Sequence, residues 1–282
     1  MHNRDLLSDI KATAKRFWGK HSLLAIVLHE IYDKSKAYAW ENISDNFSDV
    51  LTEFKMLSCS VGIGLRKWNS LSAPLEVLTD PAHGRLSKNN ETQLNVAESI
   101  FTQFFSAINS NVKKAYYERT YSDNKVDYRL YLEKFIAGTY RSIPFAIEST
   151  GNHQLLKVLC CILSACLGGT VVIDEADSGI HDVLFQKIIK ETETLITGQL
   201  ILSTHNTMLM ESEISQDSIY VISEETEGHK SVKCISDYQK RTYLSNNIRN
   251  KYLNNEYGGL PEVHEVDFST LIAQLSDELD DN

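Results

Sequence analysis

LGGTVVIDEADSGIHDVLFQKIIKETETLITGQLILSTHN, residues 167–206, is the stretch that decides the fold of this chain. Near its start, 170–173 is an apolar run rich in β-branched residues, which is typical of a strand buried on both faces of a parallel sheet. A helical pattern of apolar residues follows, and a second apolar run, 199–202, comes after it. The order strand, helix, strand predicts a βαβ unit, in which both strands end at one edge of the sheet.

Polar side chains follow both predicted strands. Asp174 and Glu175 come directly after the first strand, and Ser-Thr-His-Asn, residues 203–206, follows the second. A carboxylate at the end of a buried strand is costly unless a cation or hydrogen-bond donors balance it, and Mg²⁺ prefers carboxylates, waters and phosphates. Asp174 therefore suits a magnesium ligand that acts through water, and Glu175 suits a group that orients or deprotonates an attacking water. His205 suits a donor to a terminal phosphate.

The alternative is an ordinary strand end with two solvated acids and a surface histidine. Asp174 and Glu175 alone do not decide between the two interpretations. The second polar strand end, which brings His205 to the same edge, favours the phosphate site.

The segments VVIDEADSGIH and LILSTHN together resemble the second half of an ABC-type ATPase domain. The resemblance is strongest to the AAA-labelled bacterial branch related to the OLD and SMC-like ATPases, which is common in phage-defence and abortive-infection systems. In that family the Walker B strand ends in Asp-Glu, which here are Asp174 and Glu175. The D-loop corresponds to 176–179 and includes Asp177, and the switch histidine corresponds to His205.

Two further motifs stand in the order that the family has. Ser149-Thr150-Gly151-Asn152 matches a signature of the form Ser-x-Gly at a helix start, and Tyr252-Leu253 with Tyr257-Gly258-Gly259-Leu260-Pro261 matches a tyrosine-rich segment downstream. The resemblance covers residues 110 to 265, approximately. It implies an α/β fold of the P-loop NTPase (ABC-ATPase) type, with a parallel sheet flanked by helices, and ATP and Mg²⁺ as cofactors.

The resemblance also implies nucleotide contacts for Ser149, Gly151, Asp174 and Asp177. In the family, the signature helix start contacts the γ-phosphate of ATP bound to the other subunit. A helix N-terminus with free N–H groups suits an anion, but the motif taken alone favours an ordinary N-cap at Ser149. The position one helix before Asp174 favours the functional interpretation.

The family also needs a Walker A loop, G-x-x-x-x-G-K-[ST], which cradles the phosphates. This chain contains none: in the nearest candidate, Gly19-Lys20, His21 follows and Ala14 occupies the place of the first glycine. The sequence therefore looks like the carboxyl-terminal part of such an ATPase. A truncated reading frame, an excised fragment and one piece of a split protein remain open.

The composition sets the broad class. With 282 residues, 42% hydrophobic and 23% charged, the chain is typical of a globular protein with one large or two smaller domains. A net charge of −10 implies no general affinity for nucleic acid. No apolar run approaches the length of a membrane span, and the N-terminus is not a signal peptide, so we expect a cytoplasmic protein. Five cysteines without metal-ligand spacing predict reduced thiols.

The remaining segments predict three regions. Residues 1–108 are assigned to a helical insert or lid. Residues 1–70 are expected to be mostly helices, including 22–32 and 44–56. Loops are expected at 69–90 and an amphipathic helix at 91–108. Residues 109–265 form the ATPase half, and 266–282 an acidic tail with a short helix, 268–275. Two strands are expected at 218–222 and 232–235.

A β-hairpin is predicted within the ATPase half, with strands at 114–120 and 126–132. Basic residues decorate it, interleaved with tyrosines: Lys113, Lys114, Arg119, Arg129 and Lys134. Solvated strand faces are the favoured interpretation, and a nucleic-acid surface is the alternative.

Three hypotheses follow for the function. The first is an ATPase that meets a second copy head to tail and gates a partner, plausibly an effector protein in phage defence, with the Walker A segment supplied by another segment or subunit. The second is a non-hydrolysing interaction or regulatory module that kept the fold. The third, a DNA-binding repair factor, would need a coiled coil or a basic channel, and the sequence predicts neither.

Overall fold

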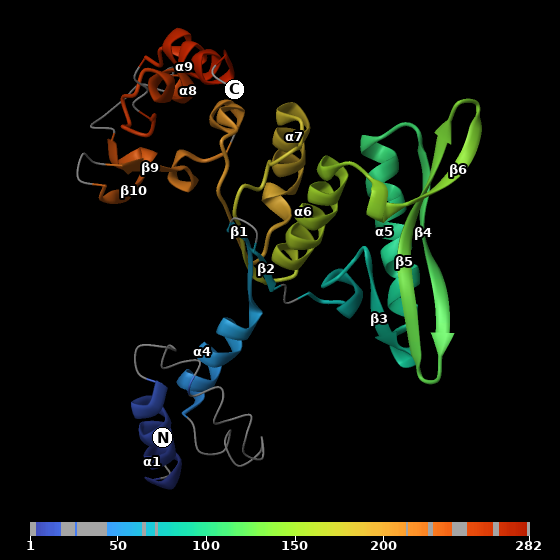
Figure 1. Cartoon of the computed structure of the whole chain (residues 1–282). Coiled ribbons are helices and arrows are strands. Elements are labelled where there is room, and N and C mark those ends of the chain that lie inside the picture. The colour runs from blue at the N-terminus through green and yellow to red at the C-terminus, as the bar shows by residue number, and fades with distance from the viewer. Residues whose placement is uncertain are drawn as a thin grey trace. The chain divides into compact units, whose positions relative to one another are not determined.

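The computed structural model describes residues 4–17, 26, 44–63, 66–70, 73–212, 214–224, 228–238, 247–261 and 265–280 (Figure 1). The chain divides into two compact units, Met1–Asn206 and Thr207–Asn282. The helix expected at 22–32 lies outside the described residues except for Ile26. Among the residues that are described, no helix combines the length and the apolar character that crossing a membrane requires.

A mixed sheet with three parallel strands forms the centre of the first unit. Its order is β2-β1-β7-β8, where β1 is Leu57–Ile63, β2 is Arg66–Ser70, β7 is Thr170–Ile173 and β8 is Gln199–Leu202. β1, β7 and β8 are parallel, and β2 runs antiparallel to β1. The strands predicted at 170–173 and 199–202 are confirmed residue for residue, and the fold is mixed α/β with helices flanking parallel strands.

β1 and β2 add two strands to residues 1–70, a region expected to be mostly helical. The helix expected at 44–56 is present as α4, Asp45–Met56, and α1, Arg4–Phe17, is a further helix of this region. From Leu57 to Ile63, however, apolar side chains alternate with Ser58, Ser60 and Gly62, which is a period of two. Ser58 is 1% exposed, so this strand is central despite its polar residues.

An antiparallel sheet forms the second part of the same unit (Figure 1). β4, Val112–Ser122, and β5, Lys125–Ile136, confirm the predicted hairpin and are longer than expected. Asp123 has φ 48°, in the left-handed region that a tight hairpin turn requires. β3, His83–Ser87, and β6, Thr139–Pro144, pair with different parts of β5, on the edge opposite β4. β3 corrects the expectation of a loop throughout 69–90.

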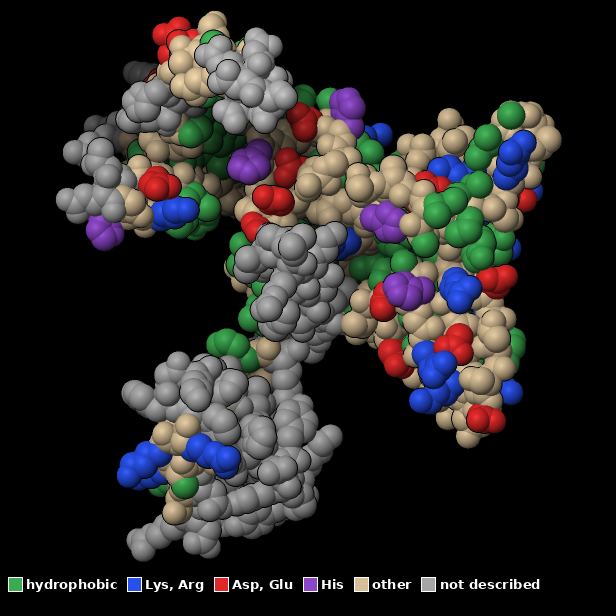
Figure 2. Space-filling view, in the orientation of Figure 1, with side chains coloured by type: hydrophobic (Ala, Val, Ile, Leu, Met, Phe, Trp, Pro, Cys, Tyr) green, Lys and Arg blue, Asp and Glu red, His purple; other side chains and the backbone are tan. Residues whose placement is uncertain are grey.

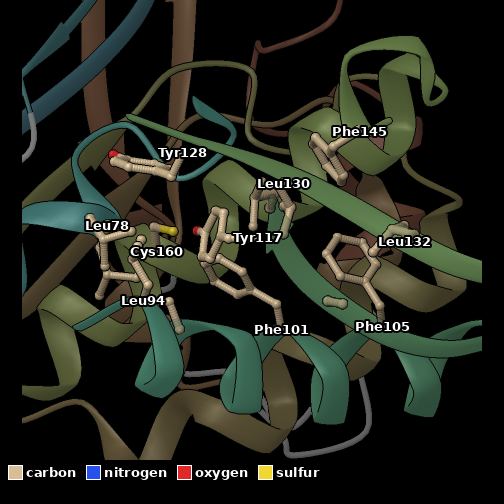
Figure 3. Packing of buried hydrophobic residues seen from close by; sticks show 14 of the residues in the cluster. Leu78, Leu94, Phe101, Phe105, Tyr117, Tyr128, Leu130, Leu132, Phe145 and Cys160 are labelled. Atoms are coloured by element: carbon tan, nitrogen blue, oxygen red, sulfur yellow. The ribbon is translucent and has the colours of Figure 1, made fainter. Parts of the chain in front are cut away.

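The main hydrophobic core lies between this sheet and α5, Thr92–Ile108 (Figure 3). Alternate residues of β4 and β5 point toward the helix, as the period of a strand requires. Phe101 and Phe105 of α5 are fully buried against them, and Phe105 meets Phe145 at a ring-centroid distance of 5.8 Å. The helix predicted at 91–108 is therefore confirmed, and its apolar face is the one that packs.

α6, Thr150–Cys166, connects this core to the parallel sheet. Leu156, Leu159 and Cys160 belong to the main core, and the helix is followed directly by β7. α7, Asp182–Thr192, is the crossover helix between β7 and β8. Short 3-10 helices complete the unit: η1 Glu76–Leu78, η2 Lys88–Asn90, η3 Phe145–Ile147 and η4 Glu193–Leu195.

The second unit is small. β9, Tyr220–Glu224, and β10, Lys230–Cys234, form the antiparallel pair that the sequence predicts, shifted by two residues or fewer. Val221, Ile235 and Tyr257 form its core. The helix expected at 268–275 is confirmed and longer. The other described elements of the second unit are η5 Thr207–Glu211, η6 Gln216–Ser218, η7 Ile235–Tyr238, α8 Ile248–Leu253 and α9 Phe268–Asp280.

All five cysteines are free thiols, as expected. Burial raises the pKa of Cys161 to about 11, and the nearby Lys157 opposes part of that rise. The folded state therefore holds the thiol proton more tightly than the unfolded state does.

Stability should consequently fall as the pH rises from the unfolded thiol value of 9.0 toward 11. The loss assigned to Cys161 is at most about 3 kcal/mol. Urea unfolding at pH 8 and at pH 10.5 measures it, with Cys161→Ala as the comparison. An identical pH dependence in the two proteins would contradict the assignment.

Candidate functional site

The carboxyl ends of β7 and β8 lie side by side. Ile173 of β7 is level with Leu202 of β8 in the parallel register. Asp174, Glu175 and His205 therefore follow neighbouring strand ends at one edge of the sheet, as the sequence predicts. Asp174 is half-buried, whereas Glu175 and His205 are exposed.

Ser203, which the sequence analysis did not single out, holds the two strand ends together. Its hydroxyl donates to Asp174 Oδ1 at 2.5 Å and accepts the backbone N–H of Glu175 at 2.9 Å. Its main chain also bridges the strand ends: the Ser203 N–H donates to the carbonyl of Ile173 at 2.9 Å, and the Ser203 carbonyl accepts from the Ala176 N–H at 3.0 Å. One serine thus fixes the rotamer of Asp174 and the path of the backbone at Glu175.

The backbone at Glu175 has an unusual conformation. Its φ is 49°, in the left-handed region that costs a residue with a Cβ about 1–2 kcal/mol. The side-chain amide of Gln154, on α6, donates to the carbonyls of Glu175 at 3.2 Å and Ala176 at 3.1 Å, which stabilises the turn. Strained backbone held by surrounding contacts is common at functional sites.

The loop after β8 is tied to the start of α7. Asn206, which is 5% exposed, donates from its side chain to the carbonyl of Asp182 at 3.0 Å. Its backbone N–H donates to Thr204 Oγ1 at 2.9 Å. These bonds hold the residues on either side of His205, so the histidine is presented from a fixed loop.

Ser149 is the N-cap of α6. Its hydroxyl accepts the backbone N–H of Asn152 at 3.2 Å, which is the N-cap role considered as the alternative for this residue. This bond does not test a nucleotide contact, since the hydroxyl can accept one bond and donate another.

The start of α6 packs against the loop that follows Ala176. A Cβ added at Gly151 would lie 2.5 Å from the carbonyl oxygen of Gly179, which itself has φ 74°. The two backbones can approach this closely because residue 151 has no Cβ, and glycine at 179 permits the positive φ there. Ser149 and Gly151 are thereby placed beside the loop that carries Glu175 and half-buried Asp177.

A buried polar cluster directly precedes Ser149 and was missed at the sequence level. Lys134 Nζ lies 2.8 and 2.9 Å from the two carboxylate oxygens of Glu148, whose side chain is 5% exposed. Asn152 Nδ2 also donates to Glu148, at 2.6 Å. The spacing Glu148–Asn152, one helical turn, was a possible signal, but nothing in the sequence identifies Lys134 as the partner. The cluster joins β5 to the first turn of α6.

The residues at the strand ends fit only one kind of metal binding. Among the described residues, no group of three or more His, Cys, Asp or Glu side chains could hold a metal ion by itself. Mg²⁺ commonly keeps several waters and takes one or two carboxylates plus substrate phosphates. One carboxylate oxygen of Asp174 accepts the hydrogen bond from Ser203, and the other is left for a water bound to Mg²⁺.

A cavity of about 210 Å³ lies elsewhere in the first unit. It is lined by residues of β1, α6 and the loop before β3, and Asp174, Glu175 and His205 are not among them. Ligand pockets usually measure about 300–1,000 Å³. The cavity is therefore smaller than a usual ligand pocket and lies apart from the strand ends.

No protein-family model matches the sequence, and no curated protein is significantly similar to it. The case for a function therefore depends on the residues and their geometry.

Ser203→Ala should lower the free energy of unfolding by about 1–3 kcal/mol, because it leaves the half-buried carboxylate of Asp174 and the N–H of Glu175 without their shared partner. Chemical denaturation measures the loss. Ser223→Ala is a suitable control, since that hydroxyl is exposed and pairs with Ser231. Equal losses in the two variants would contradict the role assigned to Ser203.

Proposed function

We propose that this chain supplies the hydrolytic half of an ATP site in a P-loop NTPase of the ABC type. The observation that carries the proposal is the Ser203-linked pair of strand ends, which places Asp174, Glu175 and His205 at one sheet edge. A strand end of this kind, with an acid held by a neighbouring hydroxyl and a second acid on strained backbone, is costly to maintain without a ligand.

Each residue has a distinct role in the proposal. Asp174 holds Mg²⁺ through water, and bound Mg²⁺ would neutralise phosphate charge. Glu175, exposed and next in the chain, orients the attacking water and accepts its proton. His205 donates to the terminal phosphate. Asp177 contacts nucleotide from the D-loop.

A second copy completes the site in this proposal. Its Ser149 and Gly151 close the ATP of the first copy, so the pair is a head-to-tail homodimer. The packing of Gly151 on Gly179 supports this, because it links the signature turn to the loop beside Glu175. A movement at one ATP would then reach the other through backbone contacts.

The phosphate-binding loop comes from a segment or subunit outside these 282 residues. β8 is the place for it: in the described part of the chain, β8 ends the sheet order, and Ile201 is 46% exposed. A parallel strand added there would end beside His205. The other side of β7 is already occupied by β1.

A non-hydrolysing interaction or regulatory module is the second candidate. It is favoured by one observation, the lack of a G-x-x-x-x-G-K-[ST] sequence in the chain. The two candidates differ in what Glu175 does, since a regulatory module needs no water-activating acid. A role in phage defence, with an effector protein as the gated partner, rests on the family resemblance alone.

Calorimetric titration of Mg-ATP into the purified chain tests whether the site is incomplete. We expect no saturable binding below millimolar nucleotide, with the fold intact by circular dichroism, because backbone N–H groups and a lysine normally supply the phosphate cradle. Saturable binding that survives Asp174→Ala and His205→Ala would show a nucleotide site elsewhere and contradict the proposal.

A further inference from the structure

The outer face of the β4–β5–β6 sheet, which points away from α5, carries an unusual set of side chains. Strand alternation sends one set of residues into the core and the other outward. The outward set is rich in aromatic rings from all three strands: Tyr116, Tyr131, Phe135 and Tyr140. We name these four residues the aromatic face.

The four rings form two pairs, which Glu133 separates along β5. Tyr116 and Tyr131 are directly opposite on β4 and β5 and stack, with centroids 5.6 Å apart and an interplanar angle of 20°. Phe135 and Tyr140 are opposite on β5 and β6, with centroids 5.2 Å apart. Phe135 is 49% exposed and Tyr140 is 54% exposed. Planar ring surface is therefore available to solvent.

Cationic groups lie directly at these rings. Lys113 Nζ is 4.3 Å from the ring centroid of Tyr140, and Lys114 Nζ is 5.7 Å from that of Tyr116. Arg129 is exposed, and its place in the strand alternation is the same as that of Tyr131. Figure 2 shows hydrophobic and basic side chains next to one another over this sheet. Acids are also present: Glu133 lies 3.3 Å from Lys113, and Glu118 accepts from the Tyr131 hydroxyl at 3.1 Å.

A sheet face that only contacts water has a different composition. The solvent side of an antiparallel sheet is normally polar, as it is nearer β3, where Arg85 pairs with Asp127. Exposed ring surface with flanking cations is the composition of a stacking platform for bases. The sequence alone favours solvated strand faces over a nucleic-acid surface. The exposed rings and nearby cations favour the nucleic-acid surface instead.

We propose that the aromatic face binds single-stranded nucleic acid. Bases stack on Tyr116, Tyr131, Phe135 and Tyr140, and phosphates lie near Lys113, Lys114 and Arg129. Duplexes are disfavoured, because their bases are already stacked on one another and are not free to stack on the rings. This site is independent of the proposed ATPase function and would remain if that function were disproved.

Fluorescence anisotropy with a labelled oligo-dT of about 15 nucleotides tests the proposal, with an oligo-U and a duplex of the same length beside it. We expect saturable binding of both single strands and weaker binding of the duplex. Tyr116→Ala and Tyr131→Ala should each weaken binding about 5- to 100-fold, as loss of one base–ring stack does. With three cations near phosphates, the slope of log K against log salt should be about −2.

Two control variants separate stacking from other effects. Tyr131→Phe removes only the hydroxyl that donates to Glu118, so binding should stay within about twofold of wild type. Tyr220→Ala removes an exposed ring, 60%, from the second unit and should have no effect. Circular dichroism confirms the fold of each variant.

Three results would each overturn the proposal. The first is no saturable binding of any single strand at low salt. The second is binding that Tyr116→Ala and Tyr131→Ala leave unchanged, which would place the nucleic acid elsewhere. The third is binding of a proline-rich peptide at this face, lost in the same variants, without binding of either oligonucleotide, which would make the face a protein-docking surface.

Discussion

Lys134→Met is expected to lower the free energy of unfolding by about 3–5 kcal/mol. The substitution leaves the carboxylate of Glu148, 5% exposed, without its cation while the side chain stays buried. Asn152 still donates to Glu148, but one amide does not replace an ammonium group that contacts both oxygens. Urea unfolding followed by circular dichroism measures the change.

A second substitution shows whether the cost comes from the unpaired charge. Lys134→Met combined with Glu148→Gln should recover most of the stability, because a neutral amide can still accept from Asn152. Lys187→Met is the matched control: its partner Glu191 is 3.8 Å away and both side chains are mostly exposed, so the loss should be below about 0.5 kcal/mol. Similar losses for Lys134→Met and Lys187→Met would contradict the buried-pair argument.

Gly151→Ala is expected to cost about 1–3 kcal/mol and to loosen the loop from Glu175 to Ile180. The added Cβ would lie 2.5 Å from the carbonyl oxygen of Gly179, which is main chain and cannot rotate aside. Alanine favours helix over glycine by about 1 kcal/mol, so a net loss means that the backbone clash outweighs this gain.

Amide hydrogen exchange across the loop measures the loosening directly, beside the unfolding curve. Gly138→Ala serves as a control, since Gly138 has φ 82° and nothing lies within 4 Å of its Cβ position. In Gly138→Ala we expect only the strain of a left-handed backbone, which lowers the free energy of unfolding by about 1–2 kcal/mol. Amide hydrogen exchange at 175–180 should not change. An unchanged exchange pattern in Gly151→Ala would show that the start of α6 and the loop at 175–180 are not mechanically linked.

Regular local patterns made part of the fold predictable. The β-branched runs of β7 and β8, the helical pattern between them and the tyrosine-rich hairpin all carry a clear period. The placement of Asp174, Glu175 and His205 at one edge followed from the right-handed βαβ rule, which needs no side-chain detail.

The missed elements depend on contacts between distant residues. β1 is a sheet strand because it pairs with β7, more than a hundred positions away, and its serines gave it a weak signal. β3 is short and is ordered by pairing with β5. Ser203 could have been suspected from its place in Ser-Thr-His-Asn, but Lys134 could not, because only the fold brings it to Glu148.

The most direct test of the central claim is ATP hydrolysis by the chain after a phosphate-loop segment, strand–GxxxxGK[ST]–helix, has been fused to it. Calorimetry first establishes that the fusion binds Mg-ATP. The account predicts measurable turnover, with Glu175→Gln binding as tightly but hydrolysing about 10²–10⁴-fold more slowly. If the fusion binds Mg-ATP and Glu175→Gln and His205→Ala hydrolyse it as fast as the parent, the strand-end residues are not catalytic and the account is wrong.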